Sequence, residues 1–93
     1  MKVAILLLCH EKPGVVAERL SSPFFASPDL KVYIHYDASR SDVDLRALAA
    51  AIPAGVNHAF VQDRVRCKWG TLALVTASQR MMRDALADAA FAP

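Results

Sequence analysis

The feature that most constrains the fold is an uninterrupted apolar run, Val3–Cys9, near the start of the chain. Its side chains do not alternate between apolar and polar, which is typical of a central strand in a parallel sheet covered on both faces. The run is too short to cross a bilayer, and it ends at His10, Glu11 and Lys12. We therefore predict a buried strand rather than a membrane anchor or a secretory signal.

The rest of the chain alternates between helix and strand patterns. Pro13 suits the first turn of a helix, and residues 31–36 (KVYIHY) are rich in β-branched and aromatic side chains, as in strands. Val75, Met82 and Leu86 recur at helical spacing. The expected elements, in chain order, are a strand at Val3–Cys9, a helix over 13–20, a strand over 31–36, a helix over 42–52 capped by Ser41 or Asp42, a weaker strand over 56–61, and a long helix that begins at Thr71.

This order of elements predicts an α/β fold, a Rossmann-like, three-layer parallel sheet with right-handed crossovers. Residues 1–93 fit one small domain, and 55% hydrophobic with 22% charged residues is the composition of a folded protein. The pattern stops where another strand would be expected. We interpret the chain as part of a larger domain, truncated at its C-terminus.

Charge and cysteine content limit the expected partners. The formal net charge is only +2 and the basic residues are scattered, so we expect neither nucleic acid nor an anionic membrane as a partner. Cys9 and Cys67 are the only cysteines, and their separation favours two reduced thiols over a disulfide framework or a zinc site. With no membrane-spanning segment and no signal peptide in the sequence, we expect a cytoplasmic or peripheral membrane location.

Polar groups follow the ends of the three predicted strands. The first strand ends at Cys9 and His10, the second ends at Asp37, and the third is followed by residues 64–69. Because ligands of such sheets bind beyond the carboxyl ends of the strands, these groups are expected to meet at one site. Their convergence is a stronger signal than any one of the residues.

Asp37 and Trp69 are the main candidates for contacts with a nucleotide at that site. The Asp37 carboxylate could accept hydrogen bonds from ribose hydroxyls or from the uracil imide, and a helix-capping or turn aspartate is the competing interpretation. Trp69, the only tryptophan, could pack on a base or sugar ring, or anchor the last helix. Gly70 allows close backbone approach or simply a tight turn.

Other side chains are secondary candidates. His10 could act as an acid or base at a strand end, whereas His35 lies inside a strand and is expected to be a packed structural histidine. Arg64, Arg66 and Lys68 form a small basic cluster that could meet a phosphate or could simply be a solvated loop face.

The sequence contains no GxGxxG or GxxxxGK[ST] motif, which argues against a dinucleotide fold and a phosphate-loop ATPase. Asp42 and Asp44 form an Asp-X-Asp pair, but they lie at the start of a predicted helix. We interpret them as helix N-terminal charge. We therefore expect no metal and no other cofactor.

Three segments together suggest a family. In order, LLLCHEKP, KVYIHYDASRS and CKWGTLALVTASQRMMRDAL resemble the opening of the Core-2/I-branching glycosyltransferases, which include β-1,6-N-acetylglucosaminyltransferases and peptide O-xylosyltransferases. Members of that family begin with an apolar strand ending in His, continue to an I-H-x-D segment, and reach a Trp-Gly pair that opens a helix. The resemblance spans essentially the whole chain. It departs from the family at Thr71 and Ala73, where Gly and Ser are usual.

The resemblance implies the N-terminal nucleotide-binding part of a GT-A-like, inverting, metal-independent enzyme. Its donor would be UDP-N-acetylglucosamine or UDP-xylose, and its acceptor a hydroxyl of a glycan or protein. The family's catalytic carboxylate and diphosphate-binding basic residues lie downstream of Pro93, so the catalytic residues are unassigned and the chain alone is expected to be inactive. The uridine-contacting positions that the resemblance implies are Leu8, Asp37, Cys67, Lys68 and Trp69.

Two other interpretations stay open. A noncatalytic α/β module that is flavodoxin-like or response-regulator-like, and that binds a partner protein, would have the same order of elements. Against a receiver domain, the first strand ends in Cys9, His10 and Glu11 rather than in an acidic cluster. The third interpretation is a structural fragment without a ligand. Selective nucleotide binding separates the first interpretation from the second, and a circular dichroism spectrum identifies the third.

Overall fold

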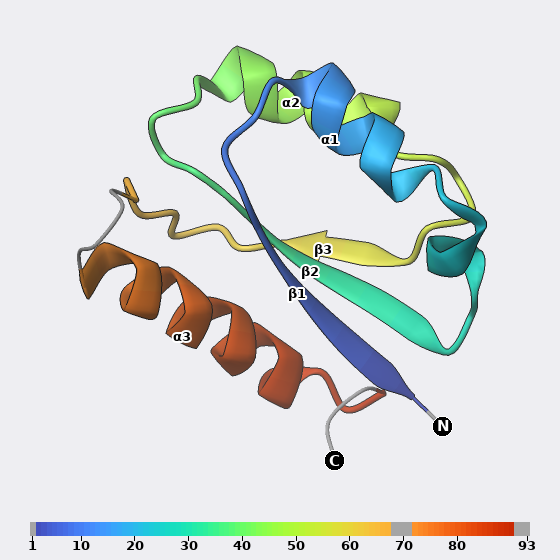
Figure 1. The fold of residues 1–93 in the computed structure, drawn as a ribbon. Helices are drawn as coiled ribbons and strands as arrows, with labels where there is room; N and C mark the ends of the chain where they lie inside the picture. The colour runs from blue at the N-terminus through green and yellow to red at the C-terminus, as the bar shows by residue number, and fades with distance from the viewer. Residues whose placement is uncertain (1, 68–71, 91–93) are drawn as a thin grey trace.

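The computed structural model of the chain describes residues 2–67 and 72–90. Strands and helices alternate along it in the predicted order (Figure 1). The expected start of the last helix at Thr71 lies outside the described residues. The elements are β1 (Val3–Cys9), α1 (Pro13–Leu20), the short 3-10 helix η1 (Pro23–Ala26), β2 (Leu30–Tyr36), α2 (Asp42–Ala51), β3 (His58–Phe60) and α3 (Leu72–Ala87).

The three strands form one parallel sheet in the order β1-β2-β3. Helices α1 and α2 cover one face of the sheet and α3 covers the other, which gives three layers (Figure 1). In the β1–β2 register Leu8 lies beside His35 and Cys9 beside Tyr36, so the two strands end level with each other. The architecture is compatible with a fragment of a Rossmann-like fold.

The first two helices begin as their sequences predict. Pro13 occupies the first turn of α1, where its missing N–H is not needed. Ser41 caps α2, since its hydroxyl accepts the backbone N–H of Asp44 at 3.1 Å. Asp42 and Asp44 both lie in the first turn of α2, where negative charge is favourable.

β2 is the best-buried strand because it lies between β1 and β3 and also has a helix layer on each face. Val32, Ile34 and Tyr36 are fully buried toward α1 and α2. Tyr33 and His35 are buried on the α3 side, so the expectation of a packed His35 is confirmed. Each fully buried apolar side chain contributes about 1.5–3 kcal/mol relative to exposure, so β2 contributes a large share of the core.

The first strand departs from the prediction, because β1 lies at an edge of the sheet rather than at its centre. Its inner side chains join the core, but Val3, Leu6 and Leu8 stay 39%, 39% and 36% exposed. An apolar run without alternation is typical of a central strand whose two faces are both covered. Among the described residues, no strand pairs with the outer side of β1.

The face of α3 also differs from the apolar stripe in the sequence. The helix buries Ala77, Met81 and Ala85. Polar contacts accompany this orientation: Arg80 and Arg83 reach Asp63, and Lys31 reaches Asp88 beyond the helix end. Helical spacing therefore predicted the helix correctly but not the face that packs. The stripe residues left exposed are Leu72, Val75, Met82 and Leu86.

No helix in residues 2–67 and 72–90 combines the length and the apolar character that a membrane span requires.

Candidate functional site

A cavity of about 360 Å³ opens at the carboxyl ends of β1 and β2. Its volume lies within the range of small-molecule sites, about 300–1,000 Å³. Segments that are far apart in the sequence meet there, as the strand-end argument predicts. The lining residues are Leu8, Cys9, His10, Glu11, Asp37, Ser39, Cys67 and Leu74.

Asp37 lines the cavity and binds two loops, one at Ser39 and one at Cys67. It directly follows β2 and is 3% exposed. One carboxylate oxygen accepts the N–H of Ser39 at 2.8 Å, and the other accepts the N–H of Cys67 at 2.9 Å. Burial raises the pKa of Asp37, but these N–H groups outweigh it and hold the pKa below its ordinary value. Asp37 is therefore a buried, ionised carboxylate at the cavity.

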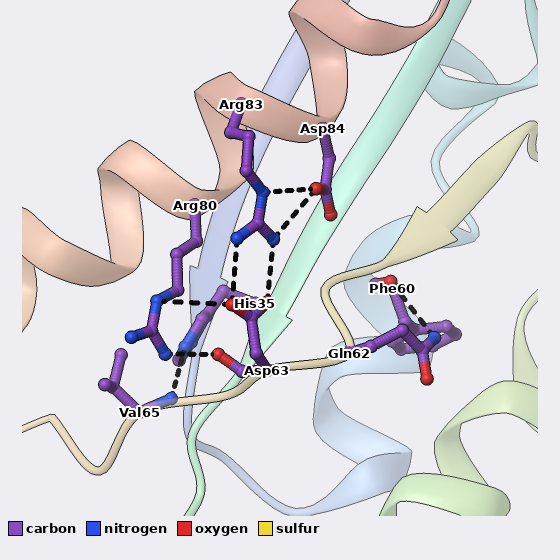
Figure 2. A network of polar contacts seen from close by, with 8 residues as sticks. All are labelled: His35, Phe60, Gln62, Asp63, Val65, Arg80, Arg83 and Asp84. Atoms are coloured by element: carbon purple, nitrogen blue, oxygen red, sulfur yellow. Dashed lines mark hydrogen bonds and ion pairs between the residues drawn. The ribbon is translucent and has the colours of Figure 1, made fainter.

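Residues 61–67, which follow β3, run alongside the end of β2. The N–H of Ala38 donates to the Val65 carbonyl at 3.0 Å. The N–H of Val65 donates to Nε2 of His35 at 2.9 Å, as Figure 2 shows. With Cys67 held by Asp37, three hydrogen bonds fix the loop at two of its residues, Val65 and Cys67. This arrangement places Cys67 at the cavity.

Arg64 secures the same loop from the other side. Its guanidinium donates to the carbonyls of Tyr36, Asp37 and Arg40 at 3.4, 3.2 and 3.4 Å. It also contacts Asp42 at 3.3 Å, and only 12% of its side chain is exposed. Arg64 is thus occupied by the protein's own oxygens rather than directed at a ligand.

Asp63 joins the loop to α3. Arg83 donates to both Asp63 carboxylate oxygens at 2.8 and 2.7 Å, and Arg80 donates to the Asp63 carbonyl at 2.5 Å (Figure 2). The bidentate contact from Arg83 lowers the pKa of Asp63. These contacts fix the flank of α3 that faces the end of β3.

The polar groups at the cavity are mainly hydrogen-bond acceptors. Glu11 accepts the N–H of His10 at 3.1 Å and contacts Arg19. Burial by itself raises the pKa of Glu11, but these hydrogen bonds and the Arg19 charge lower it by a larger amount. The pKa of Glu11 therefore lies below its ordinary value, and the side chain is ionised. Two carboxylates therefore border the cavity, and the described lining contains no Lys or Arg.

The two thiols at the cavity are poor nucleophiles. Burial raises the pKa of Cys9 to about 12. Burial and the neighbouring Asp37 carboxylate also raise the pKa of Cys67. Because the thiolate is the reactive form, both side chains serve as lining rather than as reagents.

The structure brings together four of the residues predicted for the site: Leu8, His10, Asp37 and Cys67. Arg66 is exposed and is not part of the lining. The predictions for Lys68, Trp69 and Gly70 lie outside the described residues.

Sequence reasoning did not assign Glu11, Ser39 or Leu74 to the site. Ser39 had a local signal, since an aspartate commonly accepts the N–H two residues further on. Leu74 had none, because its position depends on how α3 packs against the sheet.

Among the described residues, no three His, Cys, Asp or Glu side chains are grouped so that they could hold a metal ion. The chain matches no protein-family model, no curated protein and no solved structure.

Proposed function

We propose that this chain is the nucleoside-binding part of an inverting, metal-independent glycosyltransferase that uses UDP-N-acetylglucosamine or UDP-xylose. The observation that carries the proposal is the meeting of Leu8, Asp37 and Cys67, from three separate segments, at one cavity. The resemblance of the sequence to the Core-2/I-branching glycosyltransferases implies uridine contacts for the same three residues. The rest of the donor site and the catalytic base are assigned to other parts of a longer protein, and the acceptor is a hydroxyl of a glycan or protein.

The chemistry of the lining suits a nucleoside better than a phosphate. Leu8 and Leu74 offer apolar surface for a base, and the ionised Asp37 retains acceptor capacity for hydroxyl or imide N–H donors, because each oxygen binds only one backbone N–H. A diphosphate needs cations. Since the described lining has none, the phosphates are assigned to residues elsewhere.

The direct test is calorimetric titration of the chain with uridine, UDP, UDP-N-acetylglucosamine, UDP-xylose and GDP, with and without a chelator. Saturable binding of uridine and its nucleotides, unchanged by chelator and absent with GDP, is the expected result. A folded chain that binds none of them, or binds GDP equally well, would contradict the proposal.

A matched pair of variants on α3 locates the binding. Leu74→Phe enlarges a side chain in the cavity lining, whereas Leu72→Phe makes the same change at a position that is 81% exposed. Uridine affinity should fall at least tenfold for Leu74→Phe, about 1.4 kcal/mol, and stay unchanged for Leu72→Phe. Equal affinities in the two variants would place the nucleoside elsewhere.

A second candidate is a noncatalytic, flavodoxin-like module that binds a partner protein. The exposed apolar side chains of α3, such as Leu72 and Leu86, favour it, because apolar patches of this kind commonly mark protein contacts. A folded chain without nucleotide affinity would leave this candidate as the better one.

A further inference from the structure

Glu11 is a second carboxylate at the cavity, two residues beyond the end of β1. The chain leaves β1 and β2 at the same end of the sheet, so Glu11 and Asp37 border one space (Figure 1). The Glu11 side chain is 23% exposed, whereas Asp37 is almost completely buried. Asp37 therefore lies in the inner part of the cavity, and Glu11 lies nearer its mouth.

The segment that carries Glu11 is held by groups around the end of β2. The hydroxyl of Tyr36 donates to the Glu11 carbonyl at 2.7 Å, and Nε of Arg40 donates to the His10 carbonyl at 2.8 Å. Tyr36 is fully buried and directly precedes Asp37. The backbone positions of the two acidic residues are therefore fixed against each other before a ligand binds, and a site fixed in advance loses little entropy on binding.

The Glu11 carboxylate keeps room for two more donors. One oxygen accepts the His10 N–H at 3.1 Å, and the other contacts Arg19. An ionised carboxylate offers about four acceptor sites, so each oxygen can accept one further hydrogen bond. The ion pair is exposed on the arginine side, at 56%, and such pairs contribute little to stability. The fold therefore does not account for a carboxylate at this position.

A ribose offers the donors that this carboxylate can still accept. Its 2′ and 3′ hydroxyls are neighbours on one face of the ring, so one can donate to each oxygen of a carboxylate. Acidic side chains bind ribose hydroxyls in other nucleotide sites built on parallel sheets. A phosphate would be repelled by the ionised Glu11, and the described lining contains no Lys or Arg to offset that charge.

We propose that Glu11 binds the 2′ and 3′ hydroxyls of the ribose and makes the site selective for ribonucleosides. This inference rests on the proposed function, because it assumes that the cavity takes uridine. With the uracil imide at the more deeply buried Asp37, the base lies beside Leu8 and Leu74. The ribose then lies toward the mouth, beside Glu11, and its phosphates continue out of the cavity. Glu11 thus selects the sugar, and Asp37 recognises the base.

The first test compares ligands that differ only at the ribose, by calorimetric titration of the wild-type chain. The ligands are uridine, 2′-deoxyuridine, 3′-deoxyuridine and uracil arabinoside, in which the 2′ hydroxyl is inverted. Each analogue should bind at least about tenfold more weakly than uridine, because a hydrogen bond to a charged acceptor is lost. If any of the three analogues binds as tightly as uridine, this inference is wrong and the proposed function still stands. A folded chain that binds none of the four ligands contradicts both.

Variants test whether the selectivity comes from Glu11. Glu11→Met removes both acceptor oxygens at similar side-chain length, so uridine and 2′-deoxyuridine should bind within about twofold of each other. Glu11→Gln keeps one oxygen and should give an intermediate ratio of affinities. The control Glu18→Met makes the same change at an exposed glutamate of α1 and should keep the wild-type ratio. A folded Glu11→Met variant that keeps the wild-type preference for uridine, as expected if Asp37 bound the ribose, overturns the inference, as does an unchanged ratio in Glu11→Gln.

Discussion

The carboxylate of Asp37 accepts the backbone N–H of Cys67 at 2.9 Å, although 30 residues separate them in the chain. This contact connects the end of β2 to the loop that leads to α3. The same side chain lines the cavity proposed to bind uridine. Asp37 thus holds the loop beside the cavity and also presents hydrogen-bond acceptors to the proposed nucleoside. Its effects on stability and on binding must be measured separately.

Replacing Asp37 should lower stability as well as affinity. Asp37→Ala leaves the backbone N–H groups of Ser39 and Cys67 without their charged acceptor, which should cost about 2 kcal/mol of unfolding free energy. Urea denaturation measures the loss. The control is Asp29→Asn, an exposed aspartate, where the change should stay within about 0.5 kcal/mol. Equal stability of the two variants would show that the Asp37 contacts do not hold the loop.

Arg64 should be structural and Arg66 dispensable. Arg64→Met removes the donor shared by three backbone carbonyls and should cost about 2 kcal/mol of unfolding free energy. Arg66→Met changes an exposed side chain with the same charge and should be nearly neutral. Thermal unfolding of the Arg64→Met and Arg66→Met variants measures the two losses of stability. A larger loss of stability for Arg66→Met than for Arg64→Met would contradict the structural role assigned to the Arg64 hydrogen bonds.

His35 should make the fold sensitive to acid. Burial lowers the pKa of His35 despite the opposing effects of a backbone hydrogen bond and Asp37, with Arg64 and Arg80 lowering it further. The folded state therefore binds fewer protons than the unfolded state below about pH 6.5. Unfolding free energy should accordingly fall as the pH drops from about 7 to 5.

The variant His35→Gln should flatten that slope, because its amide oxygen can still accept the Val65 N–H without titrating. His10→Gln removes an exposed imidazole instead, and the acid slope should persist there. Denaturant titrations across the pH range give both slopes. If His35→Gln keeps the wild-type slope, then His35 is not the cause of the acid sensitivity.

The cysteines should react slowly and in a fixed order. Cys67 is only partly buried, whereas Cys9 is 2% exposed and its pKa is raised to about 12. Iodoacetamide at mildly alkaline pH should therefore modify Cys67 first and Cys9 only on unfolding, with both slower than a free thiol. Peptide mass spectrometry gives the order. If uridine binds as proposed, it should protect Cys67, and modification of Cys9 first would contradict the packing of β1.

Much of the fold could be predicted from local patterns. Val3–Cys9 is a strand with the predicted bounds, and α1 begins at Pro13, because an apolar run and a proline act on their own neighbourhood. The third strand is shorter than expected, at His58–Phe60, although Asn57 and Val61 each share one further backbone hydrogen bond with β2. The edge position of β1 could not be predicted, since it depends on which other strands are present.

The site was predictable where topology determines it. Cys9 ends β1 and Asp37 follows the end of the adjacent parallel strand β2, so their meeting at the cavity follows from the order of elements. Arg64 was grouped with the phosphate-binding candidates, because a sequence cannot show which carbonyls a guanidinium will reach. The buried face of α3 could not be predicted from its apolar stripe either, because the helix packs on Ala77, Met81 and Ala85, and the stripe residues stay exposed.

The two layers over β2 also differ in when they are synthesised. Ile34 and Tyr36 pack against α1 and α2, which lie close to β2 in the chain. Tyr33 faces α3, and its hydroxyl donates to Asp88, 55 residues later, at 2.8 Å. A chain growing from its N-terminus therefore leaves one side of its central strand bare until the last helix has been made. Nascent chains in that interval are the species most exposed to aggregation, and the ones on which a chaperone would act.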